Sequence, residues 1–301
     1  MRKVPVLLSL ALATSSLVAT SSADAQVPKP PKPVKYGYVV SNLVVPTNNN
    51  QARELAVDID KDGEVDNQMG QVFGTLASQG IDVQGAVDAM IASGSVITLL
   101  SVQTTSLKNA KGAKVRLFKG KPKVDPDYTD GRFSVDKTAP SAELKAKIVN
   151  KVLVPKAGKV PVVIPGLFNT GPTLSVHLTK GVVIAKCTKK RCTGGIIAGA
   201  ITQSDIDTRL IPSMGGAARA AIAADCTGTT EETCAEMSTG KTMMTLFDAN
   251  DDGLVTDQEV HDNSLIQSLL APDLDLNKDG TGDALSFGVG FTANAAKVKG
   301  D

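Results

Sequence analysis

Tryptophan is absent from this chain of 301 residues, and its aromatic side chains are only three tyrosines and seven phenylalanines. Binding sites for sugars and for single-stranded nucleic acids rely on aromatic rings as stacking platforms. The scarcity of such rings argues against a carbohydrate-binding module, and it also argues against a nucleic-acid partner.

Catalytic signatures are missing as well. The chain has two histidines, His177 and His261, and it contains no zinc-protease, nucleophile-elbow, P-loop or dinucleotide-binding motif. We therefore expect a protein that is not an enzyme. A secreted hydrolase that uses two carboxylates stays open as an alternative, because Asp and Glu are plentiful and their spacing in space is not visible in a sequence.

Long apolar runs are confined to the N-terminus. Arg2 and Lys3 precede an apolar stretch over 4–18, and Ala23-Asp24-Ala25 follows it. This order predicts a signal peptide over 1–25, cleaved before Gln26, and therefore an exported (periplasmic or extracellular) protein. The apolar stretch is too short for a permanent membrane helix, and we expect no transmembrane segment in the mature chain. Residues 26–36 form a Pro/Lys-rich spacer.

Four cysteines form two close pairs in the sequence, Cys187 with Cys192 and Cys226 with Cys234. Four cysteines allow three connectivities, and an oxidising compartment favours disulfides within each close pair. The alternative is a zinc site made of four thiolates, for which gaps of four and seven residues are poorly suited.

Charge is balanced in total but not in distribution. Without residues 1–25 the chain carries 30 basic and 30 acidic residues, yet the net charge is +14 over 108–191 and −12 over 205–283. The basic part is either a solvated sheet surface, which we favour because aromatic residues are not interleaved, or a contact for anionic polymers or lipids. Its densest cluster comprises Lys108, Lys111, Lys114, Arg116, Lys119, Lys121 and Lys123.

Residues 248–259 carry oxygen donors at alternate positions around a glycine, Gly253. This segment matches the calcium-binding loop of the EF-hand superfamily, and the resemblance covers about 30 residues with the flanking helices. The resemblance implies a Ca²⁺ site, and Thr256 and Glu259 also form the Thr-x-x-Glu pattern of a helix capping box. The implied ligands are Asp248, Asn250, Asp252, Leu254 (by its carbonyl), Thr256 (through a water) and Glu259 (by two oxygens).

Two further segments, 58–66 and 275–283, share a shorter pattern with glycine at the sixth position. They resemble the EF-like loops of dockerins and thrombospondin type 3 repeats, which also bind calcium, although Met69 and Ser286 stand where a twelfth-position Glu would be. An ordinary Asp-Gly turn is the alternative interpretation. The implied ligands are Asp58, Asp60, Asp62, Glu64 and Asp66 in one loop, and Asp275, Asn277, Asp279, Thr281 and Asp283 in the other.

Hydrophobic periodicity predicts the remaining elements. We expect strands at 38–45 and 52–59, helices at 68–78 and 83–92, and period-two strands over 96–200 with a turn at 179–181. In that region residues 144, 146, 148, 152 and 154 are expected to face one way and Lys145, Lys147 and Lys151 the other. A kinked helix over 204–224, short helices around 248–259 and a final strand over 285–291 complete the pattern.

These elements predict an α+β fold: an antiparallel β-sandwich or curled sheet with a helical hairpin and a C-terminal EF-hand segment. Residues 37–225 form the β-rich body, and residues 226–301 form the EF-hand segment and final strand, which dock on it. We expect an exported calcium-binding protein with a non-catalytic binding or structural role. The alternatives are the hydrolase with structural calcium sites and a sandwich that binds an apolar ligand, which an enclosed apolar cavity would favour.

Overall fold

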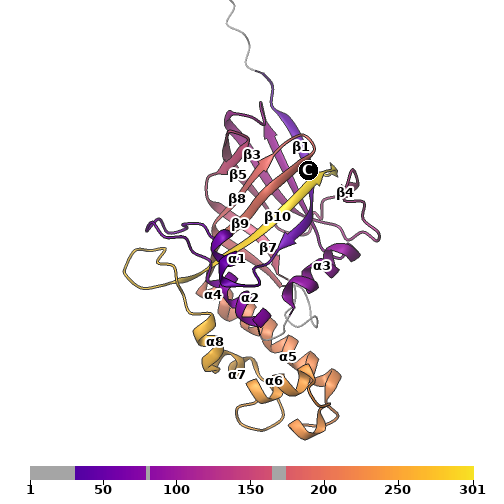
Figure 1. The fold of residues 1–301 in the computed structure, drawn as a ribbon, viewed down its shortest axis with the longest axis vertical. Coiled ribbons are helices and arrows are strands. Elements are labelled where there is room, and N and C mark those ends of the chain that lie inside the picture. The colour runs from indigo at the N-terminus through magenta and orange to yellow at the C-terminus, as the bar shows by residue number, and fades with distance from the viewer. Residues whose placement is uncertain (1–30, 79–81, 165–173) are drawn as a thin grey trace, which may run out of the picture. The chain divides into compact units, whose positions relative to one another are not determined.

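The computed structural model describes residues 31–78, 82–164 and 174–301, in which eight antiparallel strands close into a barrel (Figure 1). The α+β class is thus confirmed; of the two expected arrangements the sandwich is wrong, and the curled sheet is the nearer one, since the sheet curls until it closes. The signal peptide predicted over 1–25 lies outside the described residues. In the order in which they pair, the barrel strands are β6 (Val152–Pro155), β5 (Ser141–Val149), β3 (Ala110–Gly120), β2 (Ile97–Thr104), β1 (Val34–Val44), β10 (Ala284–Ala295), β9 (Arg191–Thr202) and β8 (Leu174–Cys187), which returns to β6.

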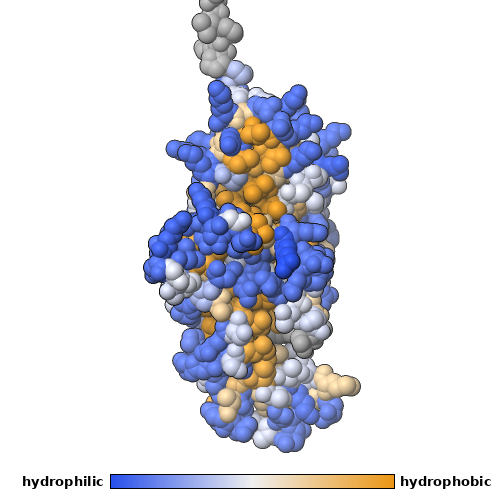
Figure 2. Space-filling view, turned by 60° about the vertical axis from the view of Figure 1, so that its left-hand side comes forward, coloured by the Kyte–Doolittle hydropathy of each residue, from blue (hydrophilic) through white to orange (hydrophobic). Residues whose placement is uncertain are grey.

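Alternation along the strands gives the closed barrel its core. In β5, Leu144, Ala146 and Ile148 are buried while Lys145 and Lys147 are exposed, as predicted. Because neighbouring strands also turn an apolar face inward, rolling the sheet into a barrel joins these faces into one core. Closure also removes the unpaired sheet edges that an open sheet would present to solvent. Figure 2 shows, on one side of the molecule, hydrophilic side chains flanking a hydrophobic band.

The turn between β5 and β6 corrects the predicted facing of Val152 and Val154, which lie on the face opposite buried Leu153. Asn150 and Lys151 both have left-handed backbone, with φ of 51° and 71°, and Val149 pairs with Val152 across them. This is the geometry of a two-residue type I′ hairpin turn. The alternation restarts after the turn, so that Leu153 is buried at 1% exposure while Val154, which was expected to face inward, is 36% exposed.

The barrel wall has one break, between β5 and β7 (Gly158–Ile164). β7 continues β6 along the chain, but it pairs with β8, and the described strands contain no ladder between β7 and β5. Pro161 lies within β7. Since proline has no N–H to donate, it is found on strands that have an unpaired edge. Between β5 and β7 the barrel wall therefore has no ladder of backbone hydrogen bonds, and only side chains make contact across it.

Two other predictions are wrong. The segment at 52–59 is not a strand: its first three residues end α1 (Asn49–Glu54), a helix that Asn48 caps by accepting a hydrogen bond from the Gln51 N–H. Residues 179–181 do not form a turn. They form an irregularity within the continuous strand β8, where the register to β9 shifts and Lys180 has a φ of 50°. A β-bulge bends a long strand around the barrel in this way.

The expected helices are present. α2 (Gln68–Ser78) and α3 (Val83–Ser93) follow β1, and Asp82 caps α3 by accepting from the Gly85 N–H. The kinked helix is a continuous helical stretch with a π-helical turn ahead of Pro212, and the helix expected after residue 259 is two helices divided at Asn263. The helices between β9 and β10 are α4 (Gln203–Asp205), η2 (Ile206–Leu210), α5 (Ile211–Asp225), η3 (Glu231–Thr233), α6 (Thr239–Phe247), α7 (Asp257–Asp262) and α8 (Ser264–Leu269).

The last long strand, β10, lies in the centre of the sheet between β1 and β9, so the expectation that it joins the main sheet is confirmed. Its residues are buried on both faces rather than on one, because α2 and the chain between α1 and α2, with Leu55 and Asn67, pack against the strand. Outside the barrel, β4 (Arg132–Ser134) pairs with β11 (Lys297–Lys299). This small sheet covers an outer apolar cluster that includes Val39 and Leu99.

Both disulfides are formed as predicted. Cys187 is bonded to Cys192 at the end of the β8–β9 hairpin, and Cys226 to Cys234 after α5. The described part of the chain has no helix long and apolar enough to cross a membrane. Of the basic cluster, Lys114 and Arg116 form ion pairs with Glu143 on the neighbouring strand, so part of its charge is neutralised.

Candidate metal centre

Three acidic loops, at 58–66, 248–259 and 275–283, have the same unusual backbone. In each loop the fourth and sixth residues have left-handed φ angles, and the sixth residue is glycine, which adopts that region without steric cost. Lysine and aspartate at the fourth position adopt it with some strain. The angles are 67° and 102° for Lys61 and Gly63, 58° and 77° for Asp251 and Gly253, and 63° and 90° for Lys278 and Gly280.

Backbone N–H groups hold the first carboxylate of each loop inward. Asp248 accepts from the N–H groups of Asp252 (3.1 Å) and Gly253 (2.9 Å). Asp275 repeats this pattern with the residues at the same two loop positions, at 3.2 Å and 2.8 Å. Asp58 accepts from the Lys61 N–H at 2.7 Å. All three loops therefore wrap around their first carboxylate, and loops 248–259 and 275–283 do so by the same two contacts.

Glu259 in loop 248–259 has one oxygen that is satisfied and one that is not. Its Oε2 accepts from the Thr256 N–H (2.8 Å) and hydroxyl (2.9 Å), and the Glu259 N–H donates to Thr256 Oγ1, which completes the predicted capping box. Its Oε1 is buried without a hydrogen-bond partner among the described residues. A buried carboxylate oxygen without a partner carries a large desolvation cost, which a bound cation would remove.

Carboxylates converge most closely in loop 58–66. Oxygen atoms of Asp58, Asp60 and Asp66 all lie within 4.8 Å of one another, which makes this trio a possible metal site. The pKa of Asp66 is raised to about 6, mainly by burial and also by the charges of Asp60, Asp273 and Asp62, against a hydrogen bond from the Ile59 N–H that lowers it. Like charges at this separation favour either a proton or a cation between them.

Loops 58–66 and 275–283 lie side by side (Figure 1). The Asp275 N–H donates to Asp60 Oδ2 at 3.4 Å, which joins the two loops directly. Each loop also repeats the same internal contact, from the N–H of its second residue to the carboxylate of its ninth, at 3.3 Å in one and 3.1 Å in the other. Between them, Ile59 and Leu274 are buried in one small apolar cluster on the outside of the barrel.

Three residues outside the predicted ligand sets, Asn67, Asp273 and Ser286, hold these loops on the barrel. Asn67 is buried at 4% exposure; its amide donates to the carbonyls of Ala52 and Gly288 and accepts from the Gly70 N–H. Ser286 accepts from the Gln68 N–H and bonds to Asp273, whose pKa is raised by burial although these hydrogen bonds lower it. An asparagine directly before a helical pattern is an N-cap signal, so the sequence contained a sign of the role of Asn67.

The remaining predicted ligands are spread along their loops. In loop 248–259 the Asn250 amide donates to Asp252 at 3.1 Å, and the Leu254 side chain is 63% exposed, so that it points away from the loop. Asp62 and Asp279 accept from the N–H two residues ahead, at Glu64 and Thr281, as Asp252 does. Within the described residues, only the trio in loop 58–66 brings three carboxylates within ligand distance of one another.

Comparison with protein-family models, with curated proteins and with solved structures finds no match for this chain.

Proposed function

We propose that this chain is an exported calcium-binding protein in which calcium has a structural, non-catalytic role. The observation that carries the proposal is the buried Oε1 of Glu259, which has no partner in the described structure and ends a loop of EF-hand pattern. A bidentate Glu at the twelfth position is the ligand that completes the shell of such a loop.

The donor chemistry favours calcium over other ions. The three loops offer carboxylate, amide, hydroxyl and carbonyl oxygens, and no His or Cys lies within 58–66, 248–259 or 275–283. Zinc prefers nitrogen and sulfur ligands. Magnesium requires a near-ideal octahedron and keeps several waters, whereas calcium accepts six to eight oxygens in an irregular shell, as a flexible loop provides.

The attachment of the loops supports a structural role. Loop 58–66 runs into Asn67, which bonds to β10, and loop 275–283 runs directly into β10. An ion in either loop fixes the start of a barrel strand or of the helix that covers it. Export is supported by the N-terminal pattern over 1–25 and by two disulfides, which are maintained in oxidising compartments.

Calorimetric titration of the mature chain, starting at Gln26 and freed of metal, tests the proposal. We expect saturable calcium binding at loop 248–259 with a dissociation constant of about 10⁻⁴ to 10⁻³ M, as in extracellular modules, and further ions in the paired loops. Magnesium and zinc titrations serve as comparisons. Absence of saturable calcium binding, or tighter binding of zinc than of calcium, would refute the proposal.

A further inference from the structure

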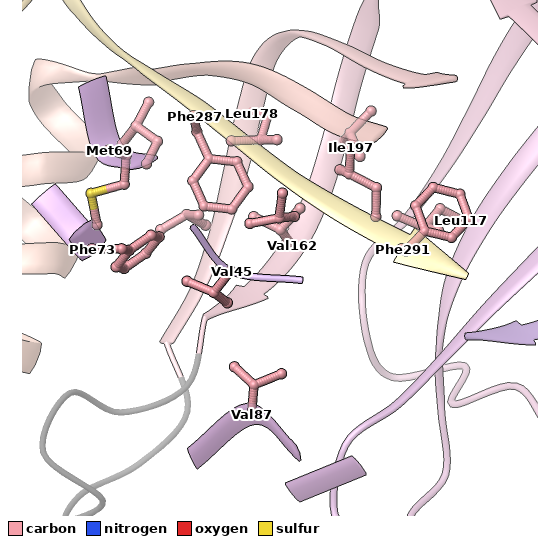
Figure 3. Packing of buried hydrophobic residues seen from close by; sticks show 14 of the residues in the cluster. Val45, Met69, Phe73, Val87, Leu117, Val162, Leu178, Ile197, Phe287 and Phe291 are labelled. Atoms are coloured by element: carbon pink, nitrogen blue, oxygen red, sulfur yellow. The ribbon is translucent and has the colours of Figure 1, made fainter. Parts of the chain in front are cut away.

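A cavity of about 320 Å³ lies at the lower mouth of the barrel, between the strand ends and α3. Figure 3 shows Val87 on α3 directed across this space toward Val45, Val162 and Phe287. Apart from Thr98, Lys119, Asp136, Thr138 and Ser175, the described residues that line the cavity are apolar or proline. Water is poorly held in such a space, because a buried water needs two to four polar partners.

The cavity results from how the barrel is built. Above it the interior is filled by side chains such as Leu100, Val102 and Leu144, all at most 4% exposed. Below, β7 separates from β5, and α3 covers the strand ends with Val83, Val87, Met90 and Ile91. Eight-stranded barrels either fill with side chains or hold one small ligand, and this barrel is filled only in its upper part.

Two charged side chains line this mouth, Lys119 and Asp136, and Lys119 lies on the inner face of β3. Lys119 follows Val115 and Leu117 at alternate positions of β3, and these two are buried in the core. Thr98 is the cross-strand partner of Lys119 on β2. Among the described residues no carboxylate lies within ion-pair distance of the Lys119 ammonium, and the nearby Asp136 carboxylate is engaged by the Thr138 N–H (3.1 Å) and hydroxyl (2.6 Å).

The geometry points to a binding site for a straight-chain carboxylic acid, with its aliphatic tail in the cavity and its carboxylate at Thr98 and Lys119. A dry apolar cavity of about 150 Å³ accommodates benzene, so about 320 Å³ corresponds to a chain of about twelve carbons. An apolar lining with a few polar groups at one end is the usual composition of such sites. The site lies apart from the three acidic loops and is independent of the calcium proposal.

Binding is tested on the mature chain with dodecanoate below its micellar concentration, and with dodecan-1-ol, which has the same tail without the charge. We expect one dodecanoate per chain. Val87→Phe and Val162→Phe, which fill the cavity from opposite sides, should each weaken binding at least about tenfold. Val149→Phe, on an exposed position of β5, should leave binding unchanged. Thermal unfolding and calcium titration of each variant confirm that it is folded.

The head group is tested separately. Lys119→Met should weaken dodecanoate binding about tenfold and leave dodecan-1-ol unaffected, because an ion pair or charged hydrogen bond is lost only with the acid. Lys145→Met, on the outer face of β5, is the matched control. Equal loss for acid and alcohol would overturn the assignment of Lys119.

A fluorescent reporter tests the same site without substitutions that fill the cavity. Because the chain has no tryptophan, Met90→Trp places a single one at the cavity, and Val124→Trp places one at a position that is 83% exposed. A dodecanoate brominated on its tail should quench the first and not the second. No saturable binding to the unmodified chain, or equal quenching at both positions, would overturn the proposal whatever the calcium titration shows.

Discussion

The Asp60 carboxylate accepts a hydrogen bond from the backbone N–H of Asp275, which lies 215 residues further along the chain. Asp60 is 8% exposed and belongs to one acidic loop, while Asp275 begins another. The bond therefore places two loops of the same pattern against each other on the barrel wall. An ion bound in one loop acts on the position of the other, because the contact involves a ligand of the first and the first residue of the second.

Glu259→Gln should weaken calcium binding at loop 248–259 at least about tenfold, which is about 1.4 kcal/mol of binding free energy. The substitution removes the charge from a two-oxygen ligand. Glutamine still supports the capping box with Thr256, so the helix that follows is expected to stay formed. Calorimetry measures the effect, with Glu236→Gln, an exposed glutamate outside the loops, as the control. Identical titrations of Glu259→Gln and the unmodified chain would reject the loop as a site.

Asp66 should make the calcium-free protein less stable as pH rises from about 4 to 7, because its contribution to the free energy of unfolding falls over this range. Burial, with the neighbouring carboxylates, raises the pKa of Asp66 to about 6 in the folded chain, above the value of about 4 in the unfolded chain. The folded state thus binds the proton more tightly, and the stability gained at low pH is lost as pH passes the folded pKa.

Thermal unfolding at several pH values, compared between the unmodified chain and Asp66→Asn, isolates this contribution. The difference between the two should shrink or reverse when calcium is added, since a cation favours the ionised carboxylate. A pH dependence that is the same in both proteins without calcium would contradict the assignment.

Calcium removal should loosen the helices α6 to α8 while the barrel stays folded. The span 205–283 has a net charge of −12, and helices of six to nine residues are marginal without tertiary support. From the sequence alone, the final strand would be expected to loosen with them. Its position as β10 between β1 and β9 changes that expectation, because it cannot detach without opening the barrel. Hydrogen exchange measures this, and loss of protection in β10 together with α6 would show that the barrel itself needs calcium.

Gly288→Ala should lower the free energy of unfolding by about 2 kcal/mol. A β-carbon at Gly288 would meet the Leu55 carbonyl and the Asn67 amide, where the chain between α1 and α2 passes over β10. Gly112→Ala is the matched control, because a β-carbon there meets nothing within 4 Å, and its effect should stay within about 0.5 kcal/mol. Chemical denaturation measures both. Equal stabilities would mean that the chain between α1 and α2 is not tightly packed against Gly288.

The sequence predicted what is local. The capping box of Thr256 and Glu259 and both disulfides depend on residues within a few positions of each other, and they were predicted correctly. Whether an alternating sheet closes is not local. It depends on the pairing of Val152 with Lys186 and of Leu153 with Ala185, which no periodicity along one strand reports.

The same limit applied to the candidate site. The three loops were identified from their oxygen pattern, but the contact between Asp60 and Asp275, and the support from Asn67 and Ser286, join segments more than 200 residues apart. The facing of Val154 was wrong for another reason: the left-handed turn at Asn150 and Lys151 reset the alternation. A two-residue turn is visible in a sequence only when its residues strongly favour that conformation.

Thr202, the last residue of β9, pairs directly with Ala284, the first of β10. Residues 203–283, with two of the three acidic loops, thus leave and rejoin the barrel at adjacent points, as an insertion into what would otherwise be a simple hairpin. Paired residues on neighbouring strands lie about 5 Å apart, a distance that a two-residue turn spans. The barrel's connectivity is therefore complete without this region, and the acidic insertion can change in length or content without altering the order of the strands.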